Sequence, residues 1–168
     1  MPEDPRIVIL CVGNLLMLDD GLGPQVYAEL RRLYDFPPTV SLLERGVMGL
    51  AILADLRAAE ELLVIDAMDN TGQPAGSVLL AQPEDLASYQ QAFRSAHDTR
   101  LVDVLTAAEM LGWHPAVTCL GVQVANANPA QYQIGLSPAV QAALPQLVAW
   151  VEQWLQARGI QLTTRPPS

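Results

Sequence analysis

Five short apolar runs constrain the fold of this chain more than any other feature. Runs of this length, rich in apolar and β-branched residues, are typical of strands buried on both faces of a parallel sheet. The segments between them repeat apolar residues at helical spacing, so predicted strands and helices alternate. This alternation predicts an α/β fold with a mostly parallel five-stranded sheet. The runs span residues 6–12, 39–44, 61–68, 76–82 and 116–124.

The predicted helices fill the segments between the strands. In the last of them Trp150 and Trp154 stand four residues apart, which predicts one apolar stripe packed into the core. Ser137 is placed to cap this helix. Residues 83–98 predict a short helix and a polar loop, and the tail 161–168 is expected to fray. The helices cover residues 23–36, 49–60, 99–111 and about 137–159.

Composition narrows the class of protein. The 168 residues, 51% of them hydrophobic, suit one domain with a substantial hydrophobic core. We expect this domain to span residues 1–168, with its folded core at about 6–159. The net charge is −9 and every basic residue is arginine or histidine, which argues against binding to nucleic acid or anionic membranes. No apolar run approaches the roughly 20 residues of a membrane span. The acidic start is wrong for a secretory signal, so we expect a cytoplasmic protein. We also expect a monomer.

The two cysteines give no sign of a disulfide framework or a metal motif. Cys11 and Cys119 each lie within an apolar run, without CxxC spacing and without a histidine close by in sequence. This setting predicts buried, inert thiols.

Polar residues gather where the predicted strands end. Asp19 and Asp20 follow the first strand, Glu44 ends the second and Asp66 stands near the end of the third, while His97 precedes a helix. Ligands of open α/β sheets bind beyond the carboxyl ends of the strands, so these side chains are expected at one edge.

Each of these residues also has a purely structural interpretation. One of the adjacent aspartates could cap the helix that follows and the other could favour its first turn, and Asp66 could be a turn residue. Two carboxylates with the imidazole of His97 would alternatively suit Ni²⁺ or Zn²⁺ with open coordination positions. The adjacent carboxylates argue against phosphate binding, and no serine or cysteine nucleophile motif is present. Hydrolysis would therefore use water activated by a metal or a carboxylate.

Several motifs together resemble one family. "GNLLMLDDGLGP", "VIDAMD", "SAHDTRLVDVL", "LGVQV" and "IGLSPAV" occur in the order and at the intervals of the maturation endopeptidases of [NiFe] hydrogenases. The resemblance extends from Ile7 to the last helix and implies a three-layer α/β fold of the phosphorylase/hydrolase-like type, with a twisted central sheet flanked by helices.

The resemblance also implies an activity of the aspartic-type endopeptidase class. Members remove a C-terminal peptide from the hydrogenase large-subunit precursor once nickel is installed. The metal-contacting residues of the family match Asp20, Asp66 and His97, which leaves Asp19 to cap the helix, although the two aspartates could exchange roles. The nickel belongs to the precursor, and no permanent metal is expected in the free protein. Where the family commonly has D-G-G-T, this chain has Glu44-Arg45-Gly46, so a catalytic part for Glu44 stays open.

Two other functions fit the same residues. One is a non-catalytic module that binds nickel and escorts it or senses its insertion. The other is a hydrolase of related architecture that acts on a different ester or amide. The "DDGLGP" element fits the endopeptidase pattern better than either of them.

Overall fold

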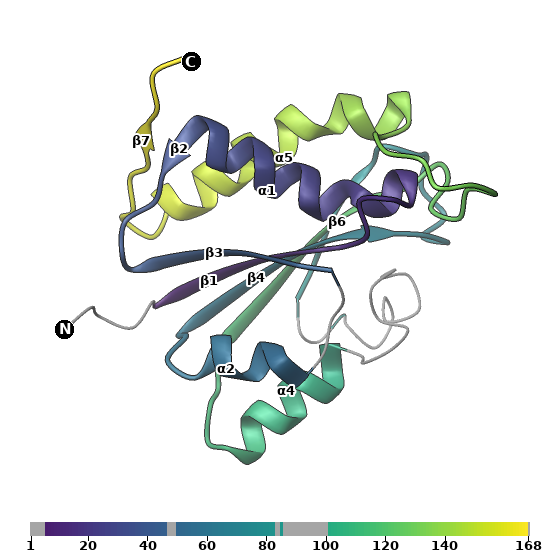
Figure 1. The fold of residues 1–168 in the computed structure, drawn as a ribbon. Coiled ribbons are helices and arrows are strands. Elements are labelled where there is room, and N and C mark those ends of the chain that lie inside the picture. Colours follow the sequence, from purple (N-terminus) through teal and green to yellow (C-terminus); the bar gives the residue numbers. More distant parts are fainter. Residues whose placement is uncertain (1–5, 47–49, 83–84, 86–100, 168) are drawn as a thin grey trace.

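The computed structural model describes residues 6–46, 50–82, 85 and 101–167. Its centre is a five-stranded sheet in the order β3-β1-β4-β6-β5, shown in Figure 1. All neighbouring strands are parallel except β5, which runs antiparallel to β6. The predicted α/β class and mostly parallel sheet are confirmed. The strands are β1 (Ile7–Val12), β3 (Val40–Arg45), β4 (Glu61–Met68), β5 (Val78–Ala81) and β6 (Ala116–Gln123).

Helices cover both faces of this sheet and complete three layers (Figure 1). On one face lie α1 (Leu22–Leu33) and α5 (Pro138–Gln156). On the other lie η2 (Leu50–Ile52), α2 (Leu53–Leu56) and α4 (Leu101–Met110). Within the described ranges, no helix combines the length and the apolar character that a membrane crossing requires.

The alternation of side chains along each strand divides the core into two clusters. Ile9 packs on the side of α1 and α5, and its neighbour Leu10 packs on the side of α2 and α4. Trp154 of α5 is buried in the first cluster, and Trp150 stacks beside it with ring centroids 6.3 Å apart. The predicted tryptophan stripe is therefore confirmed.

The predicted fraying of the tail is wrong. Two residues, β7 (Thr163–Thr164), pair in the antiparallel direction with β2 (Tyr34–Asp35). Arg165 extends this contact, because its backbone N–H donates to the Leu33 carbonyl at 2.8 Å and its Nε lies 2.6 Å from Asp35 Oδ1. The same pairing ends α1 at Leu33, three residues before the predicted boundary. The predicted helix 49–60 is also shorter, and the one predicted within 83–98 lies outside the described residues.

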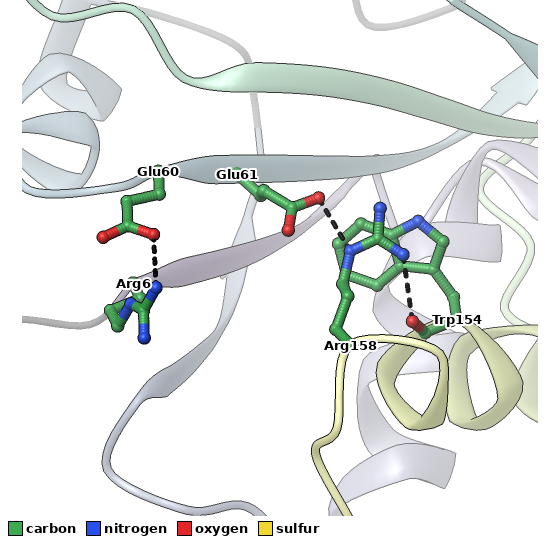
Figure 2. Close-up of polar contacts among 5 residues, drawn as sticks. All are labelled: Arg6, Glu60, Glu61, Trp154 and Arg158. Atoms are coloured by element: carbon green, nitrogen blue, oxygen red, sulfur yellow. Dashed lines mark hydrogen bonds and ion pairs between the residues drawn. The ribbon is translucent and has the colours of Figure 1, made fainter.

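Ion pairs fasten the amino edge of the sheet, opposite the edge where the parallel strands end (Figure 2). Arg158 follows α5, and its Nε lies 2.7 Å from Glu61 Oε2 at the start of β4. The same guanidinium donates to the Trp154 carbonyl at 3.0 Å and covers the Trp154 ring at 3.7 Å, a cation–π contact. Arg6 and Glu60 form a more exposed pair at 2.7 Å beside it. These contacts tie the end of α5 to the sheet.

A glycine fixes the approach of α1 to the central strand. A Cβ atom at Gly23 would lie 2.1 Å from the Val12 carbonyl oxygen and 2.6 Å from the Val12 nitrogen. Both are backbone atoms, so the clash cannot be relieved by rotating a side chain. The first turn of α1 therefore packs directly on the end of β1, and this places the loop between them.

We expect Gly23→Ala to lower the free energy of unfolding by about 3 kcal/mol, because the helix must move away from β1. Gly46→Ala is the matched control, since a Cβ there meets no atom within 4 Å. Urea unfolding of both variants measures the effect. Equal stabilities of the two variants would show that α1 is not held this close to the sheet.

Candidate functional site at the carboxyl edge of the sheet

The strand order changes direction around β1, with β3 on one side and β4 on the other. The switch point of the sheet therefore lies at β1 and β4, and the carboxyl edge beside such a point is the usual ligand site of open α/β sheets. The short helix η1 (Leu18–Gly21) follows β1 and packs against β4. The structure thus brings Asp20 of η1 and Asp66 of β4 to one edge, on adjacent elements.

Asp20 stands in a loop that closes on itself. The Asn14 backbone N–H donates to Asp20 Oδ2 at 3.2 Å and to the Asp20 carbonyl at 3.1 Å. Gly13 is required for this closure, because its φ is +150° and a Cβ there would lie 2.1 Å from the Asp20 carbonyl oxygen. The half-buried Asp20 carboxylate is therefore oriented by the backbone at the end of β1.

The sequence predicted that Asp19 caps the helix that follows it, but in the structure it does not. Neither η1 nor α1 has a side-chain hydrogen bond at its cap. The fully buried Asp19 carboxylate instead accepts four hydrogen bonds from a distant part of the chain. Oδ2 accepts from the N–H groups of Ala125 and Asn126 at 2.9 and 3.0 Å. Oδ1 accepts from the Ser137 N–H at 2.7 Å, and Oδ2 also accepts from its hydroxyl at 2.8 Å.

These contacts make Asp19 a link between three segments. It joins η1 to the loop after β6 and to the first residue before α5. Ser137 occupies the predicted N-cap position, but its hydroxyl donates to Asp19 and makes no capping hydrogen bond. Such charge-assisted hydrogen bonds satisfy a carboxylate that has no access to water.

Asp66 is 1% exposed and lies two residues before the end of β4. Its Oδ1 accepts the N–H of Ala67 at 2.8 Å. Strand alternation puts its side chain on the same side as Val64 and Met68, which belong to the cluster under α2 and α4. Asp66 is thus a buried carboxylate near the carboxyl end of β4.

Glu44 is not brought together with Asp66. It is exposed on the outer strand β3, and its partner in register on β1 is Cys11. Cys11 packs with the α1 and α5 cluster, so Glu44 points to the opposite side of the sheet from Asp66. The next residue, Arg45, bonds both carboxylate oxygens of Asp55 at 2.9 and 3.0 Å, which gives it a structural role.

The predicted histidine, His97, lies outside the described residues. The other histidine, His114, is exposed, as the sequence predicted. Across the part of the chain that the structure describes, no three His, Cys, Asp or Glu side chains form a group that could hold a metal ion. Of the predicted contact set, the described members Asp20 and Asp66 are hard oxygen ligands suited to a divalent cation that arrives with a substrate.

Both cysteines are free and buried, as the sequence predicted. Burial raises the pKa of Cys119 to about 12, with a smaller contribution from the Asp66 charge. Burial also raises the pKa of Cys11 far above its ordinary value, with a smaller contribution from Glu44. Both thiols therefore stay protonated at neutral pH, and neither can serve as a thiolate nucleophile or metal ligand.

Two amides at this edge were not predicted. Asn14 Oδ1 accepts the Leu16 N–H at 3.0 Å, an Asx turn that shapes the loop after β1. The buried Gln123 accepts the Thr71 N–H at 3.0 Å and donates to Asp69 Oδ1 at 3.3 Å, which orders the loop after β4. The Gly13-Asn14 pair signals the first turn. No local pattern signals the second contact, because its partners are 52 residues apart.

Comparison with known proteins gives a consistent result. The sequence profile described as hydrogenase maturation protease (HycI) matches residues 24–154. The hydrogenase expression/formation protein HupD of Rhodobacter capsulatus is 31% identical over 160 residues, which cover 94% of this chain and 75% of the relative. The hydrogenase 2 maturation protease of Escherichia coli K12 is 29% identical over 161 residues, which cover 95% of this chain and 96% of the relative. The solved structure of the E. coli hydrogenase maturating endopeptidase HybD superposes with a TM-score of 0.86 at 29% identity, covering 97% of this chain and 99% of that one.

We expect Asp19→Asn to destabilise the protein by about 2–4 kcal/mol, because an amide nitrogen would face backbone donors and leave them unsatisfied. Asp20→Asn is the control at the neighbouring position. It should lower the free energy of unfolding by less than about 1 kcal/mol, since an amide oxygen can still accept the hydrogen bond from the Asn14 N–H. Denaturant unfolding of both variants compares them. Equal loss of stability would contradict the linking role of Asp19.

The two thiols should resist alkylation in the folded protein. Iodoacetamide at neutral pH is expected to add nothing to the native chain in the time that modifies both cysteines in denaturant, since burial and the raised pKa values suppress the thiolate. Intact mass reads the number of additions. Rapid modification of the native chain would show an accessible thiolate.

Proposed function

The chain belongs to the hydrogenase maturation protease family, and from this premise we propose that it removes the C-terminal extension of a [NiFe] hydrogenase large-subunit precursor after nickel insertion. The observation that carries the proposal is the placement of Asp20 and Asp66 on adjacent elements at the switch point of the sheet. A carboxylate pair at such a point can contact a metal that a bound polypeptide carries to it.

In this mechanism the nickel is part of the substrate. Asp20, Asp66 and His97 would complete its coordination when the precursor docks, and docking would place the scissile bond at this edge of the sheet. Glu44, for which a catalytic part was left open, has no role in this mechanism because its side chain points to the other side of the sheet from Asp66. Recognition would then require both the inserted metal and the polypeptide around it, which explains how processing waits for nickel.

The attack on the peptide carbonyl would use water. The buried thiols are protonated, so a covalent thioester is not available. A carboxylate at this edge can accept a proton from water that attacks the carbonyl, and the bound cation would polarise either the water or the carbonyl oxygen. The products would be the shortened large subunit and a free C-terminal peptide.

The test is to incubate the purified chain with precursor in the nickel-loaded and nickel-free forms and to record intact masses. We expect loss of a C-terminal fragment from the loaded form alone. His97→Ala and Asp66→Asn should reduce the rate at least about 100-fold, the scale of losing an essential metal or acid–base contact. His114→Ala is the control with an exposed histidine and should cleave like the wild type.

Three results would change the proposal. Equal cleavage of nickel-free precursor would refute metal-gated recognition. Retained cleavage by His97→Ala would remove that residue from the contact set. Binding of the loaded precursor without any cleavage would favour the non-catalytic escort function.

A further inference from the structure

Large apolar side chains lie exposed beside the candidate site. Leu15 and Leu16 are 40% and 42% exposed in the loop after β1, and Tyr132 and Ile134 are 79% and 66% exposed in the loop after β6. We refer to these four side chains as the apolar patch. Both loops lie beyond the carboxyl ends of their strands, at the same end of the sheet (Figure 1).

The two loops are joined by backbone hydrogen bonds. The Gln133 N–H donates to the Leu16 carbonyl and the Leu18 N–H donates to the Gln133 carbonyl, each at 2.8 Å. These bonds form a parallel bridge between Met17 and Gln133. Leu16 and Tyr132 each precede the bridged residue by one position, so the parallel register places them side by side. The bridge therefore joins the two loops that carry the patch.

Asp19 orders the loop that carries Tyr132 and Ile134. Its backbone N–H donates to the Asn126 carbonyl at 3.3 Å, and its carboxylate accepts from Asn126 and Ser137, which lie on either side of the Tyr132 loop. The chain also turns at Leu18 with φ at +50°, a conformation that costs a leucine energy. A preordered surface loses little conformational entropy when a partner binds to it.

The patch is uncharged in a strongly acidic protein. The net charge is −9, yet residues 7–18 and 110–151 contain no Asp, Glu, Lys or Arg. Both loops of the patch lie within these ranges. A charged partner would find no opposite charge on these two loops, whereas an uncharged apolar segment would bind there at a small desolvation cost.

The patch is also continuous with the site. Leu16 lies in the short loop that leads into η1, which carries Asp20, and the Asn14 N–H that begins this loop donates to the Asp20 carboxylate. A polypeptide that covers the patch would therefore continue directly to Asp20. We propose that the apolar patch binds an uncharged, apolar segment of the hydrogenase large-subunit precursor and so positions the bond to be cut. This inference rests on the proposed function and assigns the docking surface for it.

The test compares two double variants in precursor processing. Tyr132→Ser with Ile134→Ser removes the most exposed half of the patch and keeps the bridge, whose hydrogen bonds are made by backbone atoms. Met110→Ser with Leu111→Ser is the control. These side chains are 85% and 55% exposed, but they lie before β6, at the opposite edge of the sheet.

The patch variant is expected to raise KM for the nickel-loaded precursor about tenfold or more, with kcat within about twofold, because the lost contacts bind ground state and transition state alike. The increase should persist at high salt, since no charge is removed. The control should match the wild type, and thermal unfolding should be unchanged in both.

An unchanged KM in the patch variant, with normal cleavage by the wild type, overturns the docking surface and leaves the proposed function standing. If the wild type self-associates and the patch variant does not, again with unchanged KM, the patch binds a second copy of the chain. This result also overturns the docking surface for the precursor. Failure of the wild type to cleave the loaded precursor refutes the proposed function itself and the inference with it.

Discussion

The Asp19 carboxylate is the contact on which the carboxyl edge of this protein depends. It is fully buried and connects η1 with Ser137, 118 residues later in the chain. A buried charge is tolerated only when its oxygens are hydrogen-bonded, so the loops that supply the four donors must assemble around it. Once they do, hydrogen bonds connect η1 after β1, the loop after β6 and the start of α5 into one unit. Asp20 is carried on that unit.

The adjacent carboxylates of Asp19 and Asp20 therefore have different roles. Asp19 is buried and organises the loops, while Asp20 is held by the backbone of the Gly13-Asn14 turn on η1, which packs against β4. The same organisation presents the apolar patch, so the patch proposed to bind polypeptide and the Asp20 carboxylate share one support. Rigid placement of this kind is what orients two reacting groups. At the far edge, Arg158 joins the end of α5 to β4 independently of Asp19 (Figure 2).

Local sequence patterns predicted the sheet and helices well, because burial on both faces of a parallel strand leaves a continuous apolar run. They failed where distant residues decide the outcome. The tail pairs with Tyr34 and Asp35, and no local periodicity signals a two-residue strand of this kind. The role of Asp19 was likewise misassigned, since its partners follow more than 100 residues later. Asp20 and Asp66 were expected at one edge because they follow or end strands of a parallel sheet, and the structure places both at that edge. His97 remains a prediction.

Nickel K-edge X-ray absorption would show whether the carboxylates at this edge contact the nickel of the precursor. Spectra would be recorded on the loaded precursor alone and on its complex with the chain, frozen before cleavage as verified by intact mass. We expect additional oxygen or nitrogen ligands at the nickel in the complex, and fewer of them when Asp20→Asn replaces the wild type. A nickel spectrum that does not change on binding would contradict the proposed contact.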